Sequence, residues 1–480
     1  MSTSTAVIAL DAIELFERPV VLRLPFRFGI VTLTECPQAF VRVRIRSADG
    51  HTHLGVAAEM MAPKWFDKNP HLSNEENFEQ LRSVLFLAHD AYLSDLKPAS
   101  AFAHFARHYD QHLRVAAARG FNPLLANYGP AMIDRAIIDA LCRANAVSFY
   151  RAMQSNLAGI DEDAELGGAT PFKGMGIDGF LQGRAPSQRL HARHTVGLVD
   201  TISNTQLLHR ANDGLPETLQ QVVAHYGHRY FKLKVAGEVA SDLDRLQSIA
   251  AVLDQIPERY YVTLDGNEQY ESAEQLGQLL ARMRGTPKLQ RLLASILFIE
   301  QPINRKTALQ TDFNRTKLGL PVLIDESDGT LDAFTLARAR GYSGVSSKTC
   351  KGIYKSVLNA ARCAAWNELV KGARFFMSAE DLTTQAGVAV QQDLALVNLL
   401  GIGHVERNGH HYVNGMVALP PMEQQRFLSL HSDLYEHSHG AVRLRISSGE
   451  LAIGSLDCVG YASNALPDFS AMTSMQLQQN

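Results

Sequence analysis

Acidic and basic side chains recur at regular intervals through residues 230–380, each at the C-terminal end of a short apolar run that we predict to be a β-strand. The intervals are close to one strand plus one helix. In a parallel barrel the carboxyl ends of all strands converge on one mouth, where active sites are built, so we expect these side chains to share one pocket. In chain order they are Lys232 and Lys234 in FKLK, Asp265 and Asn267 in LDGN, Glu300 in FIEQP, Asp325 and Glu326 in IDES, Lys348 in SSKTCKG, and Glu380 in MSAED.

Three of these side chains, Asp265, Glu300 and Asp325, place one acid at the end of each of three consecutive predicted strands. If they pack together, their like charges repel one another and raise their pKa values. A hard divalent cation removes that repulsion, and carboxylate oxygens with water suit Mg²⁺, with Mn²⁺ as an alternative. The competing interpretation is that each acid caps the following helix or is solvated. Three acids at matched strand ends favour the metal site.

Lys232 and Lys234 are two residues apart on a predicted strand, so both point to the same face, which in a barrel is the interior. A neighbouring ammonium group and a metal ion are expected to lower a lysine pKa, which makes it a base near neutral pH. Lys348 lies four strands further round, across the mouth. Lysines on both sides of a bound carbon can remove and return protons on opposite faces. The alternatives are an edge strand with solvated lysines and, for Lys348, a surface position beside Lys351.

Eight apolar runs with helices between several of them occupy about 215 residues, and this arrangement predicts a parallel (β/α) barrel. An open doubly wound sheet is the alternative, but no GxGxxG motif follows a first strand to support it. In one intervening helix, Ser241 is predicted to be the N-cap, with Asp244 three residues later. The predicted strands are 194–199, 230–235, 260–265, 296–300, 322–325, 344–348, 374–377 and 402–405.

The rest of the chain divides into regions of different pattern. Residues 6–58 alternate apolar and polar side chains and read as strands, whereas 75–155 have helical spacing. Residues 160–188 are rich in Gly, Asp and Pro and look like a connection between domains. We therefore predict an α+β capping domain over 1–185, a catalytic barrel over 186–405, and a C-terminal segment over 406–480 that packs back on the capping domain.

Composition limits the classes of partner. The 480 residues carry a formal net charge of -3 with acidic and basic residues interleaved, so we expect neither nucleic acid nor a membrane surface as a partner. The apolar runs are too short to span a bilayer, and the N-terminus makes a poor signal peptide. The five cysteines form no CxxC pair, which favours reduced thiols in the cytoplasm over a disulfide framework.

The strand motifs KLK, DGN, IEQP, DES and SSKTCKG resemble those of the enolase superfamily, specifically its muconate lactonizing enzyme subgroup in the mandelate racemase/muconate lactonizing enzyme family. The likeness covers about 190–405 and extends more weakly to the N-terminal region through PFRFGIVTL and AMIDRAIIDAL. It implies a modified (β/α)7β TIM-type barrel under an α+β N-terminal capping domain that C-terminal residues complete. It also implies homo-oligomers and an enediolate stabilised by Mg²⁺.

The resemblance implies a role for each matched position. Lys234 and Lys348 would be the acid/bases, and Lys232 would neutralise the substrate carboxylate and depress the pKa of Lys234. The Mg²⁺ ligands would be Asp265, Glu300 and Asp325. Substrate contacts would come from Arg27, Phe28, Met60 and Trp65 of the capping domain and from Asn267, Glu326 and Glu380 of the barrel. Met60, like Met61, could instead be a core residue.

The sequence also departs from the family pattern. The eighth predicted strand reads GHVERNGHHY and lacks the Asp-x-Asp with which dipeptide epimerases hold the substrate amine. Gly352 and Ile353 replace the usual Gly-Gly pair, and there are extra residues around 62–125 and at the C-terminus. His410 and His411 follow the eighth strand with Glu406. We leave them out of the metal site, because a histidine pair is more often a satisfied turn than a ligand.

These features predict abstraction of the proton next to the carboxylate of a small-molecule substrate. Return of a proton on the opposite face gives racemisation or epimerisation, and expulsion of a β-group gives cycloisomerisation. The alternatives are a carbon–oxygen lyase (a dehydratase) that uses the same intermediate, and a barrel that binds a metal ion and a carboxylate without turnover.

Overall fold

An antiparallel sheet forms one side of the N-terminal domain in the computed structural model, which describes residues 5–29, 31–164, 166, 174–207, 210–316 and 318–477. Its long strands are β1 (Ile8–Phe28), β2 (Val31–Ser47) and β3 (Thr52–Met60). The short strand β15 (Thr473–Ser474) pairs with β1 at Phe16 and Glu17, so the chain's last described residues complete this sheet.

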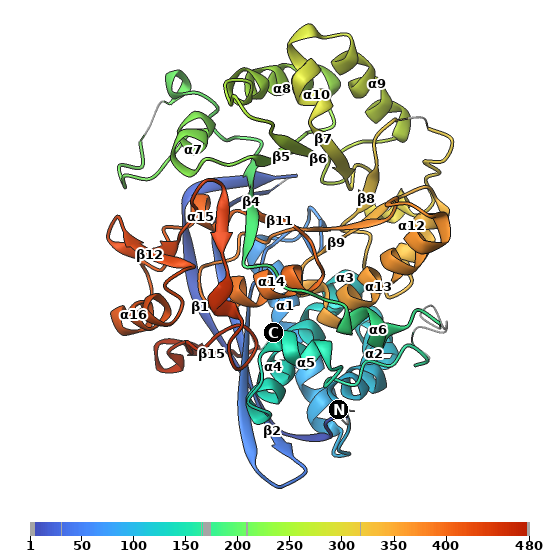
Figure 1. Cartoon of the computed structure of the whole chain (residues 1–480), viewed down its shortest axis with the longest axis vertical. Helices are drawn as coiled ribbons and strands as arrows, with labels where there is room; N and C mark the ends of the chain where they lie inside the picture. Colours follow the sequence, from blue (N-terminus) through green and yellow to red (C-terminus); the bar gives the residue numbers. More distant parts are fainter. Residues whose placement is uncertain are drawn as a thin grey trace.

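Helices cover the sheet, as Figure 1 shows beside β1 and β2. The contact of α4 with β3 is close because Gly55 has no side chain: a Cβ there would lie 2.1 Å from the carbonyl oxygen of Ala136. The predicted helical region is confirmed, and one further short helix lies within the predicted connection 160–188, of which 165 and 167–173 are outside the described residues. The helices are α1 (Asn74–Ser94), α2 (Ala101–Ala118), α3 (Pro123–Ala126), α4 (Tyr128–Ala144), α5 (Phe149–Gln154) and α6 (Ile177–Gln182).

The second domain is a closed barrel of eight parallel strands, which confirms the predicted fold class. Consecutive strands pair in chain order, and β11 pairs with β4 to close the ring. The strands are β4 (Arg189–Val196), β5 (Tyr230–Lys234), β6 (Tyr261–Asp265), β7 (Ile296–Glu300), β8 (Val322–Ile324), β9 (Gly344–Ser347), β10 (Phe376–Ala379) and β11 (His404–Arg407).

Helices connect the barrel strands and bury an apolar layer against them. They are α7 (Leu219–Tyr226), α8 (Val239–Leu253), α9 (Ala273–Arg284), α10 (Gln290–Ala294), α11 (Arg305–Ala308), α12 (Ala333–Ala339), α13 (Ile353–Val370) and α14 (Val388–Leu399). Single 3-10 turns occur at η1 (Asn204–Gln206), η2 (Pro287–Leu289), η3 (Thr349–Lys351), η4 (Gly454–Leu456) and η5 (Phe469–Ala471).

Several local predictions were wrong at their boundaries. Strand β4 begins five residues and ends three residues before the predicted strand 194–199, and β10 lies two residues beyond the predicted strand 374–377 at both ends. Helix α8 begins at Val239 with Glu238 as its N-cap, and Ser241 donates its hydroxyl to the Glu238 carbonyl at 3.2 Å, so it is not the cap. Strand β11 continues two residues beyond the predicted end, which puts Glu406 on the strand rather than after it. The strand boundary differs because β11 pairs with β4 as far as Arg407, and the local sequence does not specify that pairing.

The C-terminal segment contacts both domains. The rings of Tyr461 and Phe149 stack with centroids 3.9 Å apart, and Glu423 forms a buried ion pair with Arg18 of β1 at 3.1 Å. Strand β14 (Glu450–Ala452) pairs with β4 of the barrel instead. The remaining elements are α15 (Gly409–Tyr412), α16 (Pro421–Leu430), β12 (Tyr435–Ser438) and β13 (Ala441–Leu444). The proposed boundaries at 185 and 405 stay predictions.

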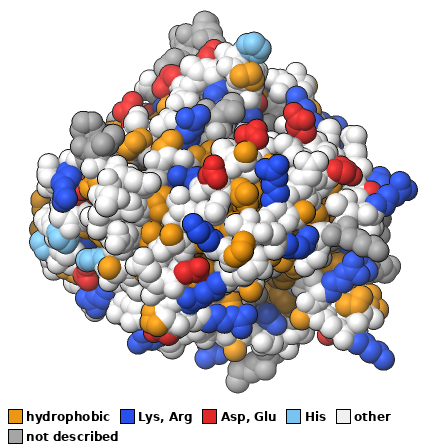
Figure 2. Space-filling model, turned by 90° about the horizontal axis from the view of Figure 1, so that it is seen from above, with side chains coloured by type: hydrophobic (Ala, Val, Ile, Leu, Met, Phe, Trp, Pro, Cys, Tyr) orange, Lys and Arg blue, Asp and Glu red, His pale blue; other side chains and the backbone are white. Residues whose placement is uncertain are grey.

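The surface in Figure 2 intersperses acidic and basic side chains, in keeping with the small net charge. No helix among the described residues is long and apolar enough to cross a membrane.

Candidate active site

Lys232 lies at the centre of the barrel mouth, among four carboxylates contributed by four other strand ends. Its Nζ is 2.8 Å from Asp265 Oδ2, 2.9 Å from Glu300 Oε1, 2.7 Å from Glu380 Oε2 and 3.0 Å from Glu406 Oε2. The lysine is only 1% exposed. The parallel register brings these groups together, because all the strands end on the same side of the barrel.

These contacts determine which groups are charged. Burial alone would lower the pKa of Lys232, but the surrounding carboxylates, Asp265 first, raise it well above the ordinary range. Burial and the like charges of Asp265 and Glu380 raise the pKa of Glu300 well above its ordinary value. The four acids outweigh burial at Lys232, so its ammonium group keeps its charge.

A second cluster surrounds Asp325 on the opposite side of the mouth. Lys348 donates to Asp325 Oδ2 at 2.7 Å, and Lys351 lies 3.3 Å from Oδ1. Although burial would raise it, these lysines hold the pKa of Asp325 well below its ordinary value. The pKa of Lys348 is raised in turn, since Asp325 outweighs its burial. Its ammonium group also lies 4.1 Å from the centre of the Trp65 ring, a cation–π contact with the capping domain.

Lys234 faces the mouth from β5, beside the first cluster. It donates to Asp265 Oδ2 and to Asn267 Oδ1, each at 2.5 Å, and its Nζ lies 6.0 Å from the Phe28 ring centre. Asn267 in turn donates to Glu326 Oε1 at 3.1 Å. The backbone of Asn267 has a positive φ of 40°, a conformation that Asn adopts more readily than most residues.

Both candidate acid/base lysines, Lys234 and Lys348, line one small cavity of about 20 Å³. Phe28 and Trp65 close it from the capping domain, and Asn267 lines it from the barrel. Strands two and six of the barrel, β5 and β9, thus direct their lysines into the same space.

Other predicted substrate contacts lie elsewhere. Arg27 is exposed and alternates with the buried Phe26 and Phe28 on β1, so the structure does not bring it to this cavity. Met60 is fully buried in the main core, as the alternative interpretation held. Glu380 lies beneath Lys232 and pairs with the buried Arg193.

Glu326 lines a larger cleft of about 740 Å³ between the capping domain and the barrel. Lys68 of the capping domain reaches across at this point. Its Nζ donates to the Asn267 carbonyl at 2.6 Å and pairs with Glu268 at 2.6 Å. These contacts fix the capping segment 62–72 over the barrel mouth.

The surroundings of the three predicted metal ligands exclude solvent. Asp265, Glu300 and Asp325 are all fully buried, and Glu300 Oε2 has no hydrogen-bond partner in the part of the chain that is described. It has only the Lys232 ammonium group 2.9 Å away. Buried carboxylate oxygens in this number fit a hard divalent cation. In this structure the ammonium groups of Lys232 and Lys348 balance their charge.

Glu406 and Asn408 line the cavity but were not among the predicted site residues. Glu406 accepts hydrogen bonds from Thr195 Oγ1 at 2.5 Å and from Asn408 Nδ2 at 3.0 Å. The signal was present in GHVERN: Glu406 and Asn408 have the two-residue spacing of the Asp-x-Asp that this strand lacks.

Comparison with known proteins agrees with this architecture. A family model described as Enolase C-terminal domain-like matches residues 214–422. The barrel of this chain is therefore similar to the C-terminal domain of enolases in sequence and in fold. The predicted resemblance to the mandelate racemase/muconate lactonizing enzyme family is confirmed. No curated protein sequence matches the chain.

Solved structures of this superfamily superpose over nearly the whole chain. A mandelate racemase/muconate lactonizing protein from Herpetosiphon aurantiacus has a TM-score of 0.58 at 16% identity, covering 95% of this chain and 99% of the other. A muconate lactonizing enzyme from Pseudomonas fluorescens has a TM-score of 0.59 at 18% identity, covering 96% of this chain and 97% of the other. A dipeptide epimerase from Enterococcus faecalis V583, complexed with Mg and a dipeptide, has a TM-score of 0.60 at 12% identity, covering 95% of this chain and 99% of the other. At these identities the likeness establishes the fold alone.

Proposed function

We propose that this protein removes the proton next to the carboxylate of a small-molecule substrate. The resulting intermediate would then either regain a proton, as in a racemase or epimerase, or expel a β-group, as in a cycloisomerase. The observation that carries the proposal is that Lys234 and Lys348, from opposite sides of the barrel, line the same cavity. A carbon bound between them would have one amine on each face, which is the arrangement that a two-base proton transfer needs.

Asp265, Glu300 and Asp325 would hold Mg²⁺, or Mn²⁺ in its place. Glu300 Oε2 is buried and has only the Lys232 ammonium group beside it in the described structure, which supports this role. The complex of the Enterococcus faecalis epimerase with Mg supports it too. When bound, the ion supplies electrostatic stabilisation of a substrate carboxylate that gains charge. Lys232, already paired with Asp265 and Glu300, would add a fixed positive charge beside the same group.

Lys234 would act on one face of the bound carbon. Its ammonium group is held by Asp265 and Asn267, which orient Nζ toward the cavity. Lys348 would act on the other face, with Asp325 and the Trp65 ring fixing its position. Phe28 and Trp65 would exclude water from the cavity, and Asn267 would contact the substrate. Glu326 and Glu380 would orient Asn267 and Lys232.

The isomerase classes are preferred because the similar structures include epimerases and muconate lactonizing enzymes. A dipeptide is a poorer candidate substrate, since the eighth strand offers one acid and one amide, Glu406 and Asn408, instead of two acids. Dehydration remains the alternative, because it follows from the same intermediate when a β-hydroxyl leaves. We further propose a cytoplasmic homo-oligomer.

The decisive experiment is exchange of the α-hydrogen of candidate carboxylic acids in D₂O with Mg²⁺, followed by NMR. The enzyme should incorporate deuterium. Lys234→Ala and Lys348→Ala should each suppress exchange of the enantiomer whose proton faces the missing amine. Lys288→Ala changes an exposed lysine that is distant in sequence from Lys234 and Lys348, and it serves as the matched control. This variant should exchange the α-hydrogen of the substrate at the normal rate.

Two outcomes would reject parts of the proposal. A ligand that raises the melting temperature without any deuterium incorporation would indicate a binding protein instead of an enzyme. Glu300→Gln should abolish Mg²⁺ dependence and activity together, because it removes one of three anionic ligands. Full activity in that variant would reject the metal site.

A further inference from the structure

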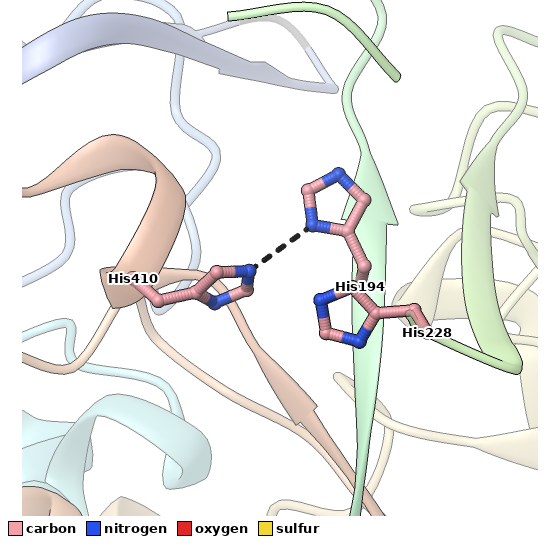
Figure 3. Close-up of side chains that lie close together, drawn as sticks. All are labelled: His194, His228 and His410. Atoms are coloured by element: carbon pink, nitrogen blue, oxygen red, sulfur yellow. Dashed lines mark hydrogen bonds between the residues drawn. The ribbon is translucent and has the colours of Figure 1, made fainter. Parts of the chain in front are cut away.

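Three buried histidines meet at the seam where the barrel closes, outside the acid and lysine clusters. His194 comes from β4, His228 from the turn before β5, and His410 from α15 after β11. Figure 3 shows the three rings turned toward one another from these separate segments. Their exposed fractions are 2%, 1% and 6%.

The spacing of the ring nitrogens matches what a metal ion requires. One nitrogen from each ring lies within 4.8 Å of a nitrogen of each of the other two, so a single metal ion can contact all three rings. His194 Nδ1 and His410 Nε2 are 3.4 Å apart. Two nitrogens bound tetrahedrally at about 2.0–2.1 Å from zinc lie roughly 3.3–3.4 Å apart, so this pair already has the required separation.

The third histidine is oriented as metal ligands usually are. His228 Nδ1 lies 3.0 Å from the Ala192 carbonyl oxygen and donates to it, which fixes the tautomer and leaves a lone pair on Nε2. That Nε2 atom is buried with no hydrogen-bond partner in the described structure. A ligand histidine characteristically donates its other ring N–H to a backbone carbonyl in this way.

The protonation states agree with the geometry. Burial, followed by the neighbouring histidines, lowers the pKa of His194 and of His410 well below the ordinary value, and burial lowers the pKa of His228 to about 4. The three rings are therefore neutral at physiological pH. Neutral imidazole is the form that binds zinc and similar ions.

Two arginines close to the site oppose a bound cation, and each is paired with an acid. Arg23 donates to the His411 carbonyl at 2.8 Å and to Asp213 Oδ1 at 2.8 Å. Arg407 pairs with Asp393. Since both positive charges are compensated, the repulsion that a divalent ion meets is reduced.

We propose that His194, His228 and His410 bind one divalent transition-metal ion of the zinc class. The ion would link the first strand, the turn before the second, and the helix after the eighth. Thr195 follows His194 on β4 and donates a hydrogen bond to Glu406 of β11, next to the site. The site would therefore stabilise the closure of the barrel and the position of Glu406 in the cavity.

The test is metal binding by the full chain after removal of all metals with a chelator, in buffer that contains Mg²⁺ to fill the acidic site. Titration with Zn²⁺ should give one ion per chain, and Co²⁺ should give the visible absorption of a tetrahedral site that Zn²⁺ displaces. At free Zn²⁺ about 100 times the dissociation constant, the folding equilibrium should shift by about 100-fold, seen as a higher melting temperature.

His228→Gln and His410→Gln should lose this binding, whereas His225→Gln, at an exposed histidine on α7, should keep it. X-ray absorption at the zinc edge on the unmodified chain should show at least three imidazole nitrogens, a result that needs no variant to fold. The proposal fails if the unmodified chain takes up no Zn²⁺ in Mg²⁺ buffer. It also fails if both glutamine variants bind normally, or if Asp265→Asn removes the zinc.

Discussion

Replacing Lys232 by methionine would remove the one cation that four buried carboxylates share. Asp265 keeps Lys234, and Glu380 keeps Arg193, so these two acids retain a partner. Glu406 loses its only ammonium neighbour within hydrogen-bond distance in the described structure, and Lys232 is the main charge that lowers its pKa. Glu300 also loses Lys232, but burial and the neighbouring acids already raise its pKa well above the ordinary value, so it takes up a proton more readily. The consequence should therefore fall chiefly on Glu406.

The magnitude follows from what Glu406 can do without Lys232. Breaking a buried ion pair by removing one partner costs about 3–5 kcal/mol. The carboxylate can limit this cost by taking up a proton, which at pH 7 requires roughly 1.36 × (7.0 − 4.3), or about 3.7 kcal/mol. At pH 5 the same step requires only about 1 kcal/mol. We expect Lys232→Met to lower the free energy of unfolding by about 3–4 kcal/mol at pH 7.

The pH dependence gives the sharper test. In the variant the folded-state pKa of this carboxyl lies above its unfolded value, so the folded state binds more protons and stability falls as the pH rises above about 4.3. Urea unfolding in metal-free buffer at pH 5 and pH 7 should therefore show the smaller loss at pH 5. Lys288→Met, at an exposed lysine, should change stability by less than about 0.5 kcal/mol. A loss below about 1 kcal/mol at pH 7, or one that does not shrink at pH 5, would refute the reasoning.

Three further predictions concern the scaffold. Gly55→Ala should destabilise the chain by about 1–3 kcal/mol in thermal unfolding, since its Cβ would lie 2.1 Å from a backbone oxygen of α4; Gly403→Ala, which meets nothing within 4 Å, should not. His431 accepts the Asn464 N–H at Nε2, and burial lowers its pKa to about 4. The unfolded chain therefore binds more protons between pH 4 and 6.5, so stability should fall as the pH drops through that window, and His431→Gln should flatten this slope in urea titrations. Thr218→Ala removes a buried N-cap of α7 and should lower stability by about 1–2 kcal/mol, with a matching fall in melting temperature.

The positions of the acids and lysines along the chain were predictable from local patterns. Each follows a short apolar run, and a run of that length bounded by a helix-forming segment predicts a barrel strand with few alternatives. Lys232 and Lys234 were expected on one face because side chains alternate along a strand. The structure has both at the mouth.

The faces that strands present to other domains were less predictable. Arg27 and Phe28 are neighbours on β1, so only one of them can face the cavity, and it is Phe28 that does. Alternation limits the choice to two registers, but the packing of the capping domain on the barrel decides between them. Glu406 was predicted to lie after the eighth strand, because the local sequence does not show that β11 pairs with β4 as far as Arg407. That pairing extends the strand to include Glu406.

The sequence by itself determined the barrel, the order of the acids and lysines, and the kind of chemistry that these residue types support, since each depends on spacing along a single strand or helix. Only the tertiary structure decided the direction of the pKa shifts, because they depend on how many carboxylates surround Lys232 within about 3 Å. It alone also brought His194, His228 and His410 together. Contacts between distant segments depend on the closure of the barrel, and no local pattern specifies the distance between residues on different strands.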